Sequence, residues 1–242
     1  MINDVTTADV QNKKKRIFDS IDNEDNSQFN NTNSLKADVS SNDLLESSLR
    51  RMKHRSIEGN KQYKLVMRQE PVHVRMCGGS DKDRRTIDPP PIVEVLEVDE
   101  AGQLYPIIKD SGFFIMRVEL WNEAKTERAK IRKRINKDLP LILGDLVMGS
   151  RVLLDDLGRT GTFFVFDDIS VRYQGRFSLK FKFYDLESED ENDCLVSKAT
   201  IKTDIFSENF VAITAREFPG MLKSSQITKV FKTQGLKLSV RN

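Results

Sequence analysis

The sequence has few of the residues that build disulfide frameworks and metal sites. Its 242 residues include two cysteines and two histidines. Cys77 and Cys194 lie far apart, which fits neither a disulfide framework nor a zinc motif. We therefore expect no metal and no cofactor, and a reducing compartment suits two unpaired thiols best.

Long apolar runs and a strong net charge are missing as well. No stretch approaches the roughly 20 apolar residues of a membrane helix, and the first residues lack the charged-then-apolar pattern of a secretory signal. We therefore expect a soluble, intracellular protein. Lys and Arg number 39 against 37 Asp and Glu, for a net charge of +2. Any attraction for nucleic acid must then come from local clusters.

Motifs of common enzymes are also absent from the sequence. It has no Gly-x-Ser-x-Gly elbow, no His-Glu-x-x-His pair and no P-loop. Cys77 and His73 would share a face only in a helix, which Pro71 and the glycines after Cys77 disfavour. We therefore predict a protein without catalytic residues, and a thiol enzyme that uses Cys77 is the minor alternative.

Residues 1–60 differ in composition from the rest of the chain. They are rich in Asn, Ser and Asp and contain only two aromatic residues. Such a segment buries too little apolar surface to offset its chain entropy, so we predict a disordered tail before a folded domain at 61–242. Two basic clusters in the tail are candidate nuclear import signals, which predicts a nuclear protein that can shuttle to the cytoplasm. They are Lys13, Lys14, Lys15 and Arg16, and Arg50, Arg51, Lys53 and Arg55.

From Tyr63 onward the sequence has the pattern of short β-strands. The clearest one places Phe177, Leu179, Phe181 and Phe183 at every second position. This period of two predicts one buried face and one face in water. The other predicted strands cover residues 63–68, 92–98, 113–120, 162–166, 169–173, 201–203, 210–215 and 236–240. So many short strands indicate a β-sandwich or barrel.

Three connections allow finer predictions. Asp167-Asp168 separates two predicted strands and indicates a hairpin. A Ser224-Ser225 start and a Gly235 stop frame a short helix, with Ile227, Val230 and Phe231 on one face. Residues 123–137 are rich in Lys and Arg and form either a short helix or a loop.

Residues 68–92 hold the pattern with the clearest chemical meaning. They combine two adjacent glycines, three successive prolines and five cationic side chains. This combination predicts the end of a strand, then a basic loop, and then a rigid proline segment where the chain leaves the loop. Cations and free backbone amides suit phosphate groups. Asp81 or Asp83 would orient an arginine or accept a hydrogen bond from a cytosine amine. The residues expected to contact phosphate are Arg75, Lys82, Arg84 and Arg85. The alternative is an internal network of salt bridges that fixes the turn, and both interpretations can hold at once.

Three segments resemble the velvet domain of fungal regulators. Residues 63–92 resemble its opening motif, with Cys-Gly, Lys-Asp-Arg-Arg and a proline triplet in order. Residues 161–187 and 205–238 are similar to its later motifs, including the Phe-Pro-Gly-Met sequence that starts at Phe218. The resemblance covers about 61–242.

The resemblance implies a fold and a function. Velvet domains have an immunoglobulin-like fold similar to the Rel domain of NF-kappaB, which implies a mostly β sandwich with one or two short helices. They bind double-stranded DNA, form homo- or heterodimers with velvet proteins, and control development, sporulation and secondary metabolism. The implied DNA-binding residues are Arg75, Lys82, Arg84 and Arg85, with Arg68 and His73 beside them.

A second function is compatible with the sequence. This chain has Gly78-Gly79-Ser80 where velvet domains have Gly-aromatic-Gly, and His73 where an arginine is common. Both differences favour a protein-interaction scaffold. Such a scaffold would bind a velvet partner or a methyltransferase-like regulator, and it would contact DNA only through the velvet partner.

Overall fold

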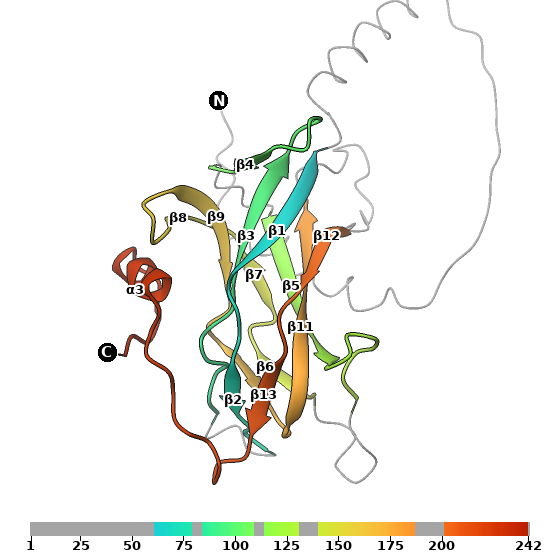
Figure 1. Cartoon of the computed structure of the whole chain (residues 1–242), viewed down its shortest axis with the longest axis vertical. Coiled ribbons are helices and arrows are strands. Elements are labelled where there is room, and N and C mark those ends of the chain that lie inside the picture. Colours follow the sequence, from blue (N-terminus) through green and yellow to red (C-terminus); the bar gives the residue numbers. More distant parts are fainter. Residues whose placement is uncertain (1–60, 79–83, 109–113, 131–139, 187–200, 242) are drawn as a thin grey trace, which may run out of the picture. The chain divides into compact units, whose positions relative to one another are not determined.

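The computed structural model describes residues 61–78, 84–108, 114–130, 140–186 and 201–241. The import candidates, Lys82, Asp81 and Asp83 lie outside the described residues. The described part is an immunoglobulin-like β-sandwich with one short helix, so the predicted fold class is confirmed (Figure 1). No helix among these residues is long and apolar enough to span a membrane.

Two sheets and a two-stranded ribbon make up the sandwich. The first sheet has the order β1-β3-β9-β8, with β4 beside β3, and the second has the order β2-β13-β11-β5-β7, with β12 beside β11. The ribbon pairs β10 with β6. The first sheet contains β1 (Gln62–Gln69), β3 (Ile92–Val98), β4 (Leu104–Pro106), β8 (Arg151–Leu154) and β9 (Thr160–Val165). The second contains β2 (His73–Arg75), β5 (Phe114–Asn122), β7 (Val147–Gly149), β11 (Gly175–Asp185), β12 (Ile201–Phe206) and β13 (Phe210–Ile213). The ribbon strands are β6 (Ile142–Gly144) and β10 (Ile169–Val171).

The core forms where the inner faces of the two sheets meet. Leu179, Phe181 and Phe183 of β11 are fully buried there, as their period of two predicted, whereas Phe177 is only half-buried. Phe183 packs edge-on against Tyr63 of β1 at 5.0 Å between ring centroids and against Phe114 at 5.3 Å. These contacts connect strands that are distant in sequence, so aromatic packing joins the two sheets.

The outer face of β11 is more covered than the alternation predicted. Lys180 is paired with Asp204 at 3.1 Å and its side chain is only 18% exposed. Its ammonium lies 5.2 Å from the Trp121 ring and 5.0 Å from the Phe206 ring. The prediction of a face in water was therefore wrong, because an ion pair and cation–π contacts cover the Lys180 ammonium. Ser178 and Tyr184 of the same face are buried as well.

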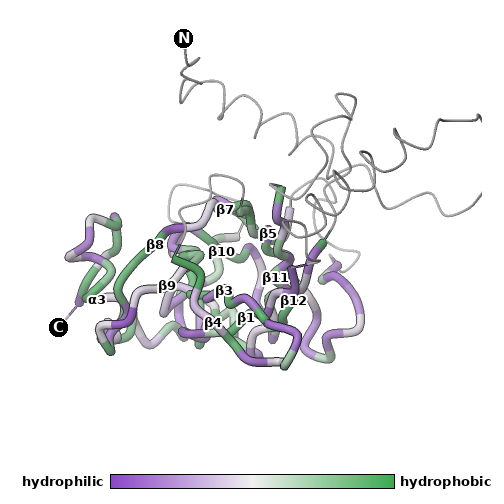
Figure 2. Tube along the Cα trace, turned by 90° about the horizontal axis from the view of Figure 1, so that it is seen from above, coloured by the Kyte–Doolittle hydropathy of each residue, from purple (hydrophilic) through white to green (hydrophobic). Residues whose placement is uncertain are grey.

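The predicted helix is confirmed as α3 (Gln226–Thr233). Ser225 is its N-cap and accepts a hydrogen bond from the Thr228 amide at 3.3 Å. Gly235 follows the helix with φ +95°, a conformation that suits glycine. Ile227 and Phe231 are buried against the outer side of the first sheet. In Figure 2, α3 accordingly lies beyond β8 and β9.

The predicted hairpin at Asp167-Asp168 was wrong. β9 pairs with β3 and β8, whereas β10 pairs with β6. The chain changes sheets between these strands, and both are buried apart from Thr160 at the start of β9. The turn packs so closely that a Cβ on Gly144, with φ +108°, would lie 1.5 Å from the Asp168 carbonyl oxygen. Only glycine fits at that position.

The structure also tests the predictions for residues 236–240 and for part of the basic segment at 123–137. The predicted final strand at 236–240 is not formed, because this segment packs beside α3 through Leu238 and not at a sheet edge. In the basic segment at 123–137, residues 123–130 form a turn and a bridge between Trp121 and Arg128 without a helix. The remainder of that segment lies outside the described residues.

Candidate nucleic-acid interface

The basic loop leaves β2 and returns toward β3 at the end of the sandwich where β2 and β13 lie in Figure 1. Backbone hydrogen bonds hold both of its arms. The Cys77 amide donates to the Val171 carbonyl at 3.0 Å, and the Ile87 amide donates to the Ile169 carbonyl at 2.7 Å. Both acceptors belong to β10. The loop therefore begins and ends on one fixed strand, which holds the residues just outside it in place.

Arg172 strengthens this attachment, a role that sequence reasoning missed. The residue is 3% exposed, and its guanidinium donates to the Gly78 carbonyl at 2.9 Å and to the Pro140 carbonyl at 3.0 Å. A buried guanidinium that binds two carbonyls fixes the first arm of the loop. Its location directly after a β-branched strand could have suggested an inward-facing cation, but its acceptors are far away in sequence.

Arg84 and Arg85 lie on the second arm in different environments. Arg84 is half-buried and forms an ion pair with Asp168, whereas Arg85 is exposed. Sequence reasoning assigned the orienting carboxylate to Asp81 or Asp83 and missed Asp168. The pair joins residues 84 positions apart, so no local pattern could have indicated it.

Three carboxyl groups lie close together near Arg84. Burial raises the pKa of Asp167, and the neighbouring Asp168 and Asp145 carboxylates raise it further. The Asp145 amide also donates to the Asp168 carbonyl at 3.1 Å, which places the two residues side by side. The surface around Arg84 is therefore of mixed charge.

His73 of β2 is less accessible than a DNA-contacting residue would be, whereas Arg75 of the same strand keeps part of its surface exposed. His73 is 7% exposed, and its ring packs against that of Phe218 at 5.0 Å. Its Nε2 atom lies 3.7 Å from a carboxylate oxygen of Asp88. Arg75 is half-buried. His73 thus contributes to packing between β2 and the segment that follows β13.

Arg68 occupies a separate place on the outer side of the first sheet. Its guanidinium pairs with Glu94 at 2.7 Å, Asp155 at 3.1 Å and Asp156 at 3.4 Å, and the side chain is 14% exposed. Burial lowers the pKa of Arg68, but the hydrogen bonds that its guanidinium donates to Glu94 and Asp155 outweigh it, so the pKa is raised. This network ties Arg68 to carboxylates outside the loop. The salt-bridge network within the loop, which the sequence left open as an alternative, stays a prediction because Asp81 and Asp83 lie outside the described residues.

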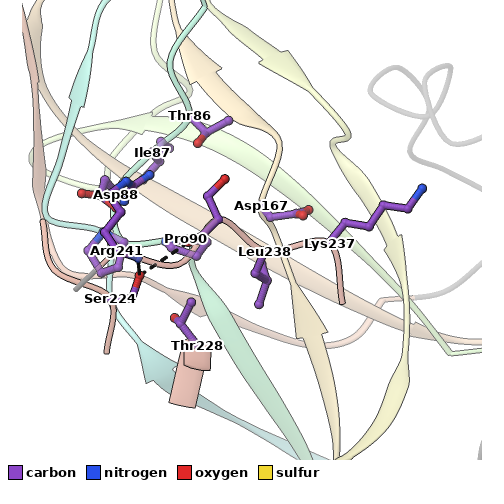
Figure 3. Close-up of a pocket in the computed structure, with 12 residues that line it drawn as sticks. Thr86, Ile87, Asp88, Pro90, Asp167, Ser224, Thr228, Lys237, Leu238 and Arg241 are labelled. Atoms are coloured by element: carbon purple, nitrogen blue, oxygen red, sulfur yellow. Dashed lines mark hydrogen bonds and ion pairs between the residues drawn. The ribbon is translucent and has the colours of Figure 1, made fainter. Parts of the chain in front are cut away.

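A small pocket separates the loop exit from the C-terminal segment (Figure 3). Its volume is about 60 Å³, which is large enough to hold water. Asp88 lies in its wall and accepts hydrogen bonds from the Leu222 amide and from Arg241, the latter at 3.1 Å. Hydrogen bonds in the wall of this pocket therefore connect the exit of the loop to residues 222–241.

Among the described residues no group of three His, Cys, Asp or Glu could hold a metal ion.

Comparison with known proteins identifies the family. A family model described as Velvet factor matches residues 63–139 and 134–242. The chain belongs to the velvet family. The velvet model thus covers both arms of the basic loop, the turn that carries Asp168, and α3.

Curated velvet relatives support the match over most of the chain. The spore development regulator vosA of Beauveria bassiana is 34% identical over 183 residues, which is 73% of this chain and 65% of vosA. The sexual development regulator velC of Gibberella moniliformis is 31% identical over 204 residues, which is 82% of this chain and 44% of velC. The developmental and secondary metabolism regulator ve-1 of Neurospora crassa is 28% identical over 199 residues, which is 74% of this chain and 35% of ve-1. This velvet chain therefore spans less than half the length of several relatives.

Proposed function

We propose that this velvet protein is a non-enzymatic regulator of fungal development, sporulation and secondary metabolism that binds double-stranded DNA through the loop between β2 and β3. The observation that carries the proposal is the placement of Arg84 and Arg85. Both follow a loop whose two arms are hydrogen-bonded to β10. Cations on a rigid support lose little conformational freedom when they bind DNA.

The set of proposed DNA-contacting residues is narrower than the sequence indicated. It comprises Arg84, Arg85 and Lys82, which precedes them in the same motif, and Arg75 at the start of the loop. Arg68 and His73 are left out, because Arg68 is paired with three carboxylates and His73 is packed against Phe218.

The protein is further proposed to act as a homo- or heterodimer with velvet proteins and to reside in the nucleus. The relatives named above support the regulatory role, and the two basic clusters before residue 60 support nuclear import. If both clusters are replaced by alanine in a fluorescent fusion, nuclear accumulation should be lost. Unchanged accumulation would remove the clusters from the proposal.

The scaffold function remains the second candidate, since one observation favours it. Arg84 already has a carboxylate partner in the isolated chain, which reduces the positive charge available for DNA. A gel-shift with the chain alone and with a velvet partner separates the two functions. Binding by the chain alone supports direct recognition, and binding only after the partner is added supports the scaffold.

Replacing Arg84 and Arg85 together by alanine should weaken DNA binding about tenfold or more, since a lost arginine contact to DNA costs roughly 1–3 kcal/mol. Fluorescence anisotropy with a labelled pool of random duplexes measures the effect without knowledge of the site. A change of less than twofold, with the fold intact by circular dichroism, would contradict the proposed interface.

The matched control replaces two exposed lysines at the opposite end of the sandwich. Lys64 of β1 and Lys202 of β12 are both exposed, and the K64A/K202A variant also loses two positive charges. The number of phosphates that the protein contacts, and not its net charge, sets the affinity for DNA. The affinity of this variant should therefore stay within about twofold of that of the unmodified protein.

A further inference from the structure

The segment that follows β13 carries an excess of positive charge. Residues 214–241 contain six cationic side chains and a single acidic one, Glu217. The whole chain has a net charge of only +2, so the residues outside this segment are slightly acidic in sum. The six cations are Arg216, Lys223, Lys229, Lys232, Lys237 and Arg241. Positive charge is therefore concentrated in the C-terminal segment, outside the basic motif of the loop.

Three of these cations serve the fold itself. Arg241 donates to the Asp88 carboxylate at 3.1 Å, so its charge is neutralised. Lys232 donates to the Leu238 carbonyl at 2.7 Å, which fixes the chain after α3. Lys229 is half-buried on the same helix. These three are less available to an external anion.

The other three cations are available to a ligand. Arg216, Lys223 and Lys237 are exposed, and within the part of the chain that the structure describes none of them has a carboxylate partner. An unpaired cation gains more from an added anion than a cation that is already neutralised. Arg216, Lys223 and Lys237 are therefore the accessible cations of the C-terminal segment.

Arg216 lies beside the first arm of the basic loop. The Ile213 carbonyl accepts from the Met76 amide at 2.9 Å, and the Phe218 ring packs against that of His73 at 5.0 Å. Arg216 falls between these two contacts in the sequence. Figure 1 shows the chain leaving β13 next to β2, where the first arm begins.

Lys223 and Lys237 lie beside the second arm. Lys223 directly follows Leu222, whose amide donates to the Asp88 carboxylate at the exit of the loop. Lys237 lines the small pocket together with Thr86 (Figure 3). The three accessible cations therefore border the basic loop on both of its arms.

The loop needs such neighbours if it is to hold DNA. The carboxyl groups of Asp145, Asp167 and Asp168 lie near Arg84 and reduce the positive potential there. Affinity for DNA rises with the number of phosphates that a protein neutralises, and a duplex carries one negative charge per roughly 1.7 Å of its axis. A duplex that touches the loop would extend past both arms and present phosphates to the cations beside them.

We propose that Arg216, Lys223 and Lys237 of the C-terminal segment contact the phosphate backbone of the duplex on either side of the basic loop. This inference rests on the proposed function and adds to it a second set of contacts from a distant part of the sequence. Phosphate contacts position a protein on a duplex without reading its sequence. The long lysine side chains suit this role, because an ammonium group binds phosphate as a point charge.

The experiment measures the affinity of the K223A/K237A variant for a labelled pool of random duplexes by fluorescence anisotropy, over a range of salt concentrations. The protein is tested alone and with a velvet partner. The slope of log affinity against log salt should become less steep by about 1.8, since each neutralised phosphate contributes about 0.9. R216A should reduce the slope by about 0.9. The loss of affinity should be the same for duplexes of different sequence.

The K64A/K202A variant is again the matched control. It also replaces two exposed lysines by alanine, but at the opposite end of the sandwich, so its slope should equal that of the unmodified protein. Melting temperatures of all variants within a few degrees of that of the unmodified protein exclude misfolding as the cause of a loss.

The outcomes separate this inference from the proposed function. No DNA binding by the unmodified protein, alone or with a partner, overturns both. Weaker binding by R84A/R85A together with an unchanged slope for K223A/K237A overturns the inference alone. An unchanged slope with loss of binding to a velvet partner in the absence of DNA would assign the lysines to a protein interface and overturn it too. A loss confined to particular sequences would contradict contacts to phosphate.

Discussion

Replacing Phe231 by alanine is expected to lower the free energy of unfolding by about 4 kcal/mol, within the range of 3–5 kcal/mol for buried phenylalanines. Phe231 is fully buried in α3, and its ring packs against that of Phe163 at 5.0 Å between centroids. The two rings belong to a cluster that also contains Leu153 of β8 and Leu238 of the C-terminal segment. Truncation would therefore leave a cavity where helix, sheet and C-terminal segment meet. Denaturation in urea, monitored by circular dichroism, measures the loss.

The control for this prediction is the preceding residue of the same helix. Val230 is only half-buried, so Val230→Ala removes less buried surface and introduces a better helix former. We expect a loss below about 1 kcal/mol. Similar effects for both variants would show that α3 does not complete the core of the described domain.

Replacing Asp155 by alanine is the second substitution with a large expected effect, a loss of about 3 kcal/mol. Its carboxylate accepts from the amides of Leu157 at 2.9 Å and Arg159 at 2.8 Å, and from the Arg68 guanidinium at 3.1 Å. Removal would leave Arg68 with fewer partners at a largely buried site and remove the acceptors that shape the turn between β8 and β9. Breaking a buried pair typically costs 3–5 kcal/mol, and the 64% exposure of Arg159, the other partner of Asp155, favours the lower end.

The contribution of Asp155 should depend on pH. Burial raises the pKa of this carboxyl, but hydrogen bonds from the Arg159 amide and guanidinium and from Arg68 outweigh it and lower the pKa to about 2. A folded-state pKa below the ordinary value means that the stabilisation is complete above about pH 4 and is lost as the pH falls toward 2. The stability difference between the unmodified protein and D155A should therefore shrink over this interval.

Asp156 provides a matched control for Asp155. Its carboxylate lies 3.4 Å from the same guanidinium, and its side chain is 32% exposed. D156A removes one charge of the same sign from the adjacent position, and we expect a loss below about 0.5 kcal/mol, as for exposed ion pairs. A D155A effect as small as that, or an equal D155A effect at pH 2 and pH 7, would show that the carboxylate is not the centre of this network.

Local patterns in the sequence predicted most of the elements. The alternation in β11 and the β-branched run in β3 are periodic over seven or more residues, and both strands are present. The Ser225 cap and Gly235 stop of α3 were found for the same reason, because caps depend on residues within one turn of the helix. The predictions at 167–168 and 236–240 were wrong because turn residues and apolar alternation do not specify the partner of a strand.

The candidate interface was also predicted only in part from the sequence. The sequence placed a basic, glycine-containing loop between two strands, and the velvet motifs indicated its family. It could not indicate that Arg68 is paired with Asp155 or that His73 packs against Phe218. These partners come from distant segments, and side-chain contacts between distant segments depend on how the sheets pack.

The sequence by itself determined the class of fold, the order of most strands, the capped helix and the location of the basic loop, since each depends on the chemistry of neighbouring residues. Tertiary structure alone decided which cations stay accessible. Arg84 and Asp168 meet because the chain changes sheets after β9 and places β10 beside the loop. The electrostatic state of the loop therefore depends on a contact across 84 residues, which no local pattern encodes.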